Sequence, residues 1–291
     1  MMKKNNEKEK HTIIGKLVGQ IKKDKLTFAV YVLLRIAVIL AMIASCLSGH
    51  YENLFVCTLS LVLFLVPAFF ETNFGIELPS ALEIIILLFI FAAEILGELG
   101  SYYVKVPIWD TALHTINGFL CAAVGFSLVD IVNRNERFKL QLSPLFLAIV
   151  AFCFSMTIGV LWEMFEFTAD MVFKTDMQKD FVVHTISSVA LDPTNSNKAV
   201  VIDGITDVAV NGQSLGLGGY LDIGLIDTMK DLIVNFVGAV VFSIIGYFYV
   251  KSRGKNKFAG NFIPRLAESE KEPQSAPEPN AKPDKENTGN T

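Results

Sequence analysis

Six apolar stretches, each long enough to cross a bilayer as a helix, dominate the first 250 residues. They lie at 27–47, 53–71, 81–98, 109–131, 144–169 and 230–250. The hydrocarbon core of a bilayer is about 30 Å thick and a helix rises about 1.5 Å per residue, so about 20 apolar residues span it. The pattern predicts an all-α fold, a polytopic membrane bundle of about six transmembrane helices.

The composition agrees with a membrane protein. Of 291 residues, 52% are hydrophobic and only 19% are charged, against about 45–50% and about 25% in soluble domains. We expect a basic cytoplasmic arm over 1–26, a transmembrane domain over 27–250 that includes an extracytoplasmic loop over 171–228, and a cytoplasmic tail over 251–291. The tail is rich in Pro, Glu, Lys, Ser and Asn, a composition typical of disorder.

The distribution of Lys and Arg predicts the orientation in the membrane. Basic residues are concentrated before the first span, after the fourth and after the last, whereas the other connections hold few. By the positive-inside rule these three segments are cytoplasmic. The chain is therefore expected to be a multi-pass protein of the bacterial plasma membrane with both termini in the cytoplasm.

The cysteines offer one competing interpretation. The residues "IASC" at 43–46 have the form of a lipoprotein cleavage box, which would make Cys46 a lipidated N-terminus. We prefer a membrane span, because the apolar run contains Arg35 and exceeds the ~7–15 residues of a signal-peptide core. The other cysteines occur singly and are best explained as small buried side chains.

The long connection at 171–228 mixes two patterns. "MQKDFVVHTISSVAL" suggests a short amphipathic surface helix, and "AVVIDGITDVAVNGQSL" suggests strands that turn at Asn211 and Gly212. Two arrangements stay open: a compact cap over the helix ends, or a loosely ordered loop.

Acidic residues in four spans are expected at one depth, toward the outer leaflet. They are Glu94 and Glu98, Asp110 beside His114, Glu163 with Glu166 and Asp170, and Asp227 with Asp231. Their spacings of three, four and seven residues place each set on one helical face. These faces should turn inward, because a charged side chain in lipid costs at least ~2.5–3.5 kcal/mol.

Several of these polar residues have ordinary structural explanations. Asp110 and Asp227 stand where helices begin and are expected to cap backbone N–H groups, while Glu98 and Asp170 can reach interfacial water. Asn117 and Asn235, with Gly118 and Gly238, suit close helix packing and interhelical hydrogen bonds.

The remaining acids and the histidine lie deeper and predict a metal site. Three acids and one His without a matched Lys or Arg repel one another unless acids are protonated or a cation is bound. The predicted ligands are His114, Glu163, Glu166 and Asp231. The predicted surrounding or capping residues are Asp110, Asp227, Asn235, Asp170, Asn117 and Glu94. One His among carboxylates, without a thiolate, favours Mn, Fe or Zn.

The blocks "WDTALHTINGF", "GVLWEMFEFTAD" and "GLIDTMKDLIVNFVGA" resemble, in this order, those of YjdF-like bacterial inner-membrane proteins. That family has no assigned biochemical function, and the resemblance covers roughly residues 80 to 250.

There is a looser likeness to VanZ-like proteins, which share an Asp-x-x-x-His block, a later Glu and an Asp-x-x-x-Asn-x-x-Gly-Ala block. The matching positions here are Asp110 and His114, Glu163, and Asp231, Asn235, Gly238 and Ala239. VanZ-like proteins are associated with envelope and glycopeptide-antibiotic phenotypes, but the longer segment before "GLIDT" departs from their pattern.

Three functional classes remain open. The first is an outward-facing divalent-metal centre, either structural or hydrolytic on an envelope or lipid substrate. The second is a proton- or cation-coupled transporter, and the third is a structural membrane protein without chemistry. Serine-hydrolase, zinc-protease, phosphate-loop and multi-histidine motifs are absent from the sequence. The lipid bilayer is the expected partner, nucleic acid is not, and no protein partner is indicated.

Overall fold

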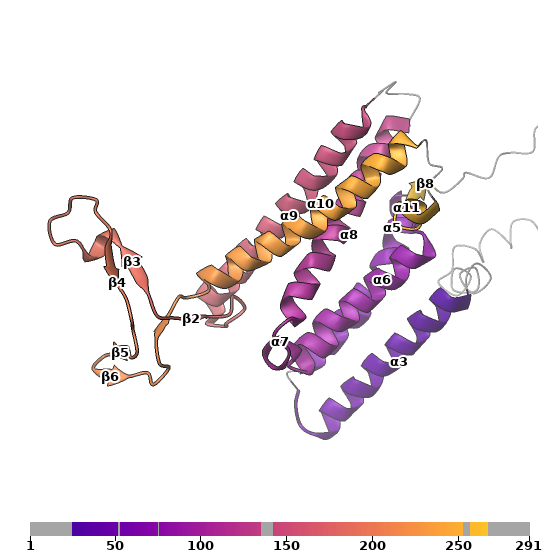
Figure 1. Ribbon diagram of the computed structural model, residues 1–291. Coiled ribbons are helices and arrows are strands. Elements are labelled where there is room, and N and C mark those ends of the chain that lie inside the picture. The colour runs from indigo at the N-terminus through magenta and orange to yellow at the C-terminus, as the bar shows by residue number, and fades with distance from the viewer. Residues whose placement is uncertain (1–24, 52, 75, 135–141, 253–256, 267–291) are drawn as a thin grey trace, which may run out of the picture.

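The structure, a computed structural model, describes residues 25–51, 53–74, 76–134, 142–252 and 257–266. Within these residues the protein forms a bundle of six helical spans (Figure 1). Most of the expected arm at 1–26 and of the expected tail at 251–291 therefore lies outside the described residues.

The predicted fold class is confirmed: the chain is a multi-pass, predominantly helical membrane protein. The spans are α3 (Lys25–Leu47), α4 (Asn53–Leu63) with α5 (Val66–Phe74), α6 (Ser80–Ile90) with the π-helical η1 (Phe91–Leu99), α8 (Trp109–Arg134), α9 (Pro144–Phe173) and α10 (Leu225–Lys251). The last span begins five residues before the predicted 230, because its first turns are amphipathic rather than wholly apolar.

Local signals explain where the long helices begin and end. Ser143 caps α9 by accepting a hydrogen bond from the Phe146 N–H, and Pro144 occupies the first helical position, where a missing N–H costs nothing. The helix ends at Lys174, which adopts the left-handed conformation. Gly224, with φ of 77°, provides the turn before α10.

The helices form two groups with separate cores (Figure 1). Helices α8, α9 and α10 pack on one another around Ala122, Phe126, Ala151 and Phe242, each fully buried. The other core lies among α3, α4, α6 and η1. Helix α8 joins the groups, since it also contacts α6, η1 and the short α7 (Tyr102–Lys105).

Residues 257–266, which lie within the expected cytoplasmic tail, pack against the bundle. Helix α11 (Lys257–Gly260) leads into β8 (Arg265–Leu266), which pairs with β1 (Ile76–Glu77). Ala259 and Ile263 are buried in the α8–α10 core, and the Phe262 ring packs edge-on against Phe119 at 5.5 Å. This short stretch is more apolar than the rest of the tail, so it has surface to bury.

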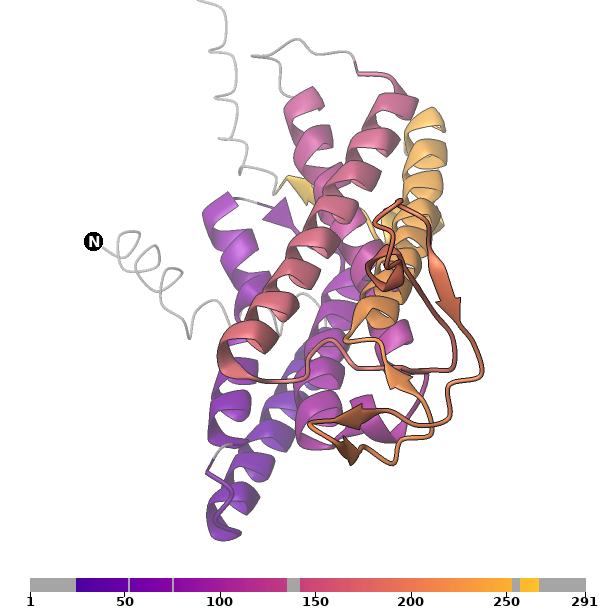
Figure 2. The ribbon, with the colours of Figure 1, turned by 90° about the vertical axis from the view of Figure 1, so that its left-hand side faces the viewer.

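The connection between α9 and α10 forms an arm, defined as residues 182–221. It contains β2 (Val182–Val183), β3 (Ile186–Ser188), a 3-10 turn η2 (Val189–Leu191), β4 (Val200–Ile202), β5 (Ala209–Val210), β6 (Gln213–Ser214) and β7 (Tyr220–Leu221). The strands form antiparallel pairs β2–β7, β3–β4 and β5–β6. Figure 1 shows the arm projecting beyond the ends of α9 and α10, rather than forming the compact cap that was one expectation, and Figure 2 shows the arm in front of the bundle when the molecule is viewed from that side.

Part of the arm follows the sequence pattern and part does not. Asn211 and Gly212 form the β5–β6 turn, both with positive φ, as predicted. The predicted surface helix in "MQKDFVVHTISSVAL" is wrong, because β2, β3 and η2 occupy this stretch. Its β-branched residues find strand partners in β7 and β4, and this long-range pairing outweighs the local helical spacing.

Candidate metal centre

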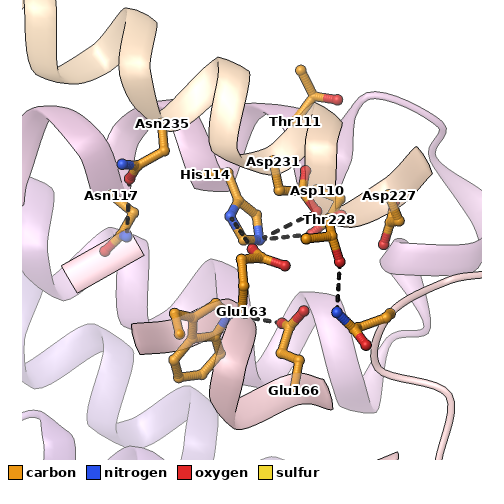
Figure 3. Close-up of polar contacts among 12 residues, drawn as sticks. Asp110, Thr111, His114, Asn117, Glu163, Glu166, Asp227, Thr228, Asp231 and Asn235 are labelled. Carbon is orange, nitrogen blue, oxygen red and sulfur yellow. Dashed lines mark hydrogen bonds and ion pairs between the residues drawn. The ribbon is translucent and has the colours of Figure 1, made fainter. Parts of the chain in front are cut away.

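Three helices place acidic side chains around one histidine at the end of the bundle where α8 and α10 begin and α9 ends. We call this the Asp110 end. Figure 3 shows His114 from α8 between Asp231 of α10 and Glu163 of α9, with Asp110 one turn away on its own helix. The side chains of Asp231, Glu163 and His114 are 3%, 7% and 11% exposed, and that of Asp110 is 27% exposed.

One nitrogen of the imidazole faces two aspartates. His114 Nε2 lies 3.5 Å from Asp110 Oδ1 and 3.8 Å from Asp231 Oδ2. The three donor atoms that these residues offer all lie within 4.8 Å of one another. These distances exceed the 2.7–3.2 Å of an N–H···O hydrogen bond. They are close to the ~3.4 Å that separates donors held ~2.1 Å from a tetrahedral metal.

The other ring nitrogen faces the third helix. His114 Nδ1 lies 3.8 Å from Glu163 Oε1. The second carboxylate oxygen, Glu163 Oε2, is buried and has no hydrogen-bond partner among the described residues. Leaving a carboxylate oxygen buried without a hydrogen-bond partner is costly, and a proton or a bound cation would offset this cost.

Glu166 is positioned separately from this group. Its Oε1 accepts a 2.7 Å hydrogen bond from the indole N–H of Trp162, one turn earlier on α9. Glu166 is buried, but it does not belong to the close group of three donors. That group contains Asp110, for which helix capping was predicted, in place of Glu163 and Glu166.

Asp110 does not act as a helix cap in the described part of the chain. Its carboxylate contacts the His114 ring, which lies one turn later on the same face of α8. The sequence placed both groups at one depth, but the choice between capping and facing the imidazole depends on the side-chain conformation.

Two other aspartates accept hydrogen bonds from the segment that follows α9 and hold it across the helix ends. Asp170 accepts hydrogen bonds from the Thr175 hydroxyl and from the backbone N–H groups of Met177 and Gln178, at 2.7–2.9 Å. Asp227 accepts the Lys179 N–H at 2.9 Å. The predicted capping role of Asp227 is therefore replaced by a bond to another segment.

Asp222, which sequence reasoning missed, lies two residues before the N-cap Gly224 and binds the first turn of α10. It accepts the N–H of Ile226 at 2.7 Å and the N–H of Phe181 at 2.7 Å. The signal was present in "LDIGLIDT", where an Asp precedes the helix, but the capping role was assigned to Asp227 instead.

A layer of amides and small residues lies deeper than the histidine. Asn117 Nδ2 donates to Asn235 Oδ1 at 3.4 Å, as Figure 3 shows, and the Ser155 hydroxyl donates to the Gly118 carbonyl at 2.7 Å. Asn235 is 1% exposed. This layer joins α8, α9 and α10 and fixes the rotation of each helix below the acidic cluster.

No hydrogen bond or ion pair connects Glu94 of η1 to the cluster in the described residues, and no Lys or Arg there forms an ion pair with it. Lys230, next to Asp231 in the chain, instead places its ammonium 4.3 Å from the Phe181 ring centre. Within the described residues, therefore, no basic side chain is ion-paired with the acids around His114.

Comparisons with known proteins identify a family but no activity. A family model described as "Predicted membrane protein (DUF2238)" matches residues 30–252. An "Uncharacterized protein" of Thermotoga maritima is 26% identical over 106 residues, which cover 36% of this chain and 53% of that protein. The chain thus spans about half the length of this relative. No solved structure matches.

Proposed function

We propose that this chain, which belongs to the DUF2238 family of predicted membrane proteins, holds a divalent cation between Asp110, His114 and Asp231. The close approach of these three donors from two helices carries the proposal. Two carboxylates and one imidazole suit Mn, Fe or Zn, because Mg and Ca gain little from a nitrogen ligand.

The two ring nitrogens of His114 divide the roles in this arrangement. Nε2, which faces both aspartates, would bind the cation. Nδ1 would be oriented by Glu163, since a metal-bound histidine commonly directs its second nitrogen at a carboxylate. The positive charge would also offset the burial of the unpaired Glu163 Oε2. Glu166, held by Trp162, would add negative charge nearby.

The donor count favours a reactive centre over a purely structural one. Three protein ligands leave a fourth position for water or substrate, as in catalytic zinc sites, whereas structural zinc sites have four protein ligands. The partial exposure of Asp110 gives this position access from the Asp110 end. The proposed chemistry is hydrolysis of an envelope or lipid substrate by metal-activated water.

The proposed location is the bacterial plasma membrane, with the Asp110 end outside. The Lys and Arg distribution supports this orientation. The likeness to YjdF-like and VanZ-like blocks supports the site, because those blocks contain Asp110, His114, Glu163 and Asp231. The proposed outward orientation of the Asp110 end is the basis for placing the substrate in the envelope.

A transporter is supported less well. Below the amide layer, the α8–α10 core is closed by Ala122, Phe126, Ala239 and Phe242, each 0% exposed. A carried ion would have to cross this apolar layer, whereas a static centre at one end of the bundle needs no such route.

Metal analysis of the purified protein tests the proposal. We expect about one equivalent of Mn, Fe or Zn by elemental analysis for a single-metal centre. The variants His114→Ala and Asp231→Asn should lose most of it. His184→Ala is the matched control, because His184 lies in the exposed arm and its Nδ1 contacts the Ile205 carbonyl.

Thermal unfolding in detergent provides the second measurement. A chelator should lower the melting temperature of the wild type and leave that of His114→Ala unchanged, because binding to the folded state alone is stabilising. Wild-type protein that contains no metal, and whose melting responds to neither chelator nor added Mn²⁺ or Zn²⁺, would show the proposal to be wrong.

Reconstitution distinguishes hydrolysis from transport. Vesicles that contain the metal-loaded protein should hydrolyse lipid-linked envelope precursors supplied in the membrane, and those that contain His114→Ala should not. The same vesicles should hold a proton or Mn²⁺ gradient as tightly as protein-free vesicles do. Movement of either ion that Asp231→Asn abolishes would favour the transporter instead.

A further inference from the structure

The arm at residues 182–221 has strands but no apolar core of its own. None of its apolar side chains is buried, and its strands pack mainly on one another in two-stranded pairs. Val189, Val201, Ile202 and Val210 are each 44–60% exposed. A two-stranded hairpin is only marginally stable in water. The arm would therefore gain stability from a surface that covers these side chains.

The rest of this chain is badly placed to provide that cover. Figure 1 shows the arm beyond the ends of α9 and α10, clear of the helices. The longer stretches outside the described residues connect to the opposite end of the bundle, where α3 begins and α8 and α10 end. The 27 residues of α10 separate the two ends by about 40 Å, and the bilayer lies between them. The cover must come from another molecule.

The charge of the arm argues against a lipid surface as this cover. Among its residues Lys198 is the only Lys or Arg, against three acids, Asp192, Asp203 and Asp207. Segments that bind anionic headgroups instead carry clusters of Lys or Arg. The exposed apolar side chains of the arm therefore suit a protein surface better.

The β3–β4 hairpin offers an open apolar edge to such a partner. Ile186 of β3 lies opposite Ile202 of β4, and Ser187 lies opposite Val201. Because side chains alternate between the faces of a strand, Ile186, Val200 and Ile202 share one face. Within the described residues β4 pairs with β3 alone, so the backbone groups on its other edge are open to a further strand. All three residues of β4 are apolar and β-branched, a composition that favours strand pairing.

We infer that this edge is a dimer interface, at which β4 pairs antiparallel with β4 of a second copy of the chain. The two Val201 residues lie on the two-fold axis, and Val200 of each copy lies opposite Ile202 of the other. Every cross-strand pair is then apolar and β-branched. Asp203 lies opposite Ala199, so no like charges face each other. The product is a four-stranded sheet in which both β4 edges are covered.

A second copy fits this edge for reasons of symmetry and size. Antiparallel pairing of a strand with itself is isologous and closes at two subunits. The β3 edge is less suitable, because Ser187 and Ser188 give it fewer apolar side chains. The arm is also longer than the ~20–30 residues that one partner contributes to an interface of standard size. Two arms can therefore form a stable contact without any change in the helical bundle.

Disulfide cross-linking in membranes tests the register. In a background without the four native cysteines, Val201→Cys should cross-link to itself on mild oxidation, because directly opposite Cβ atoms lie ~4.5–5.5 Å apart. Val200→Cys and Ile202→Cys should each cross-link poorly alone, since diagonal neighbours lie ~7–8 Å apart, and well when the two are co-expressed. Val210→Cys is the matched control: it is 52% exposed in β5 and should show only background cross-linking on a non-reducing gel.

The mass of the protein in mild detergent is the second measurement. Light scattering corrected for detergent should give twice the chain mass of 32.1 kDa. Val201→Lys places like charges directly opposite each other and should shift the protein to a monomer, whereas Val210→Lys should stay dimeric. Because the arm contributes nothing to either helical core, Val201→Lys should keep the wild-type melting temperature of the dissociated bundle and its wild-type metal content.

Three results would overturn the inference. The first is a monomeric wild type that cross-links no better at 201 than at 210. The second is a dimer that Val201→Lys leaves intact, since its contact would then lie elsewhere. The third is cross-linking of position 201 to a different protein in place of a second copy. None of these results bears on the metal centre, because the substituted residues lie outside the proposed ligands.

Discussion

Gly238 of α10 packs directly on the backbone carbonyl of Thr115 in α8, so that a Cβ at this glycine would stand 2.0 Å from the carbonyl oxygen. Gly118 of α8 makes the reciprocal contact, and its Cβ would stand 2.1 Å from the Asn235 carbonyl oxygen. Because both obstacles are backbone atoms, no side-chain rotation relieves them. These two contacts hold α8 and α10 together immediately below His114 and Asp231.

Gly238→Ala should therefore separate α8 from α10. We expect a loss of about 3 kcal/mol of stability, the upper end for overpacking a closed interface, and loss of bound metal as His114 moves from Asp231. Thermal melting in detergent and elemental analysis measure both effects. Ser243→Ala on the same helix is the control: its hydroxyl is buried without a partner in the described structure, so removal should be neutral or stabilising.

Asp170→Asn should loosen the segment after α9 without removing the metal. The Asp170 carboxylate accepts three hydrogen bonds from residues 175–178, and losing its charge should cost about 1–3 kcal/mol locally. Limited proteolysis should then cut between 174 and 181 faster than in the wild type. If Asp170→Asn lost its metal as Asp231→Asn is expected to, the proposal that Asp170 only holds the segment after α9, whereas Asp231 binds the metal, would be wrong.

Cysteine labelling tests the proposed orientation. In a background without the four native cysteines, a cysteine at 105 or 195 should react with an impermeant reagent in intact cells, whereas one at 251 should react only after the membrane is opened. Labelling at 251 in intact cells would place the Asp110 end in the cytoplasm and would move any substrate to that side.

One turn of the arm should keep its hydrogen bonds when the pH is lowered. The Asp192 carboxylate accepts four hydrogen bonds, from the hydroxyl and the N–H of Thr194 and from the hydroxyl and the N–H of Ser196. These bonds hold the pKa of Asp192 below its ordinary value. The pKa of an Asp carboxyl in an unfolded chain is ~3.9. A carboxyl whose pKa is lowered by folding stabilises the fold at pH values above ~3.9, and this stability is lost only as the pH falls through the lower pKa of the folded state. Amide exchange at Thr194 and Ser196 should stay protected from pH 7 to pH 4, and Asp192→Ala should remove this protection throughout. Protection that disappears between pH 6 and pH 4 in the wild type would contradict the assignment.

The spans were predictable because hydropathy reports directly on burial in lipid. The Asn211–Gly212 turn was predictable for a different reason, since only a few pairs of residues readily adopt positive φ at two successive positions. The strand pairing of β2 with β7 was not, because it joins residues almost 40 positions apart and overrides local spacing. The burial of Ile263 likewise depends on a surface that only the assembled helices create.

The site was predictable in depth but not in detail. Charge and spacing placed Asp110, His114, Glu163 and Asp231 at one level, where the structure has them. Which acids face the imidazole depends on the rotation of each helix about its axis, and the Gly118 and Gly238 contacts set that rotation.

The Asn117–Asn235 bond joins residues 118 positions apart, and this separation affects how the protein is made. Chains are synthesised from the N-terminus, so α8 and α9 are complete before α10 exists. Until α10 arrives, His114 and Glu163 have no Asp231 beside them, and Asn117 has no amide partner. The group of Asp110, His114 and Asp231 can therefore come together only after α10 has been made. A chain that ended before residue 225 would hold five of the six described spans but would lack Asp231, one of the three proposed ligands.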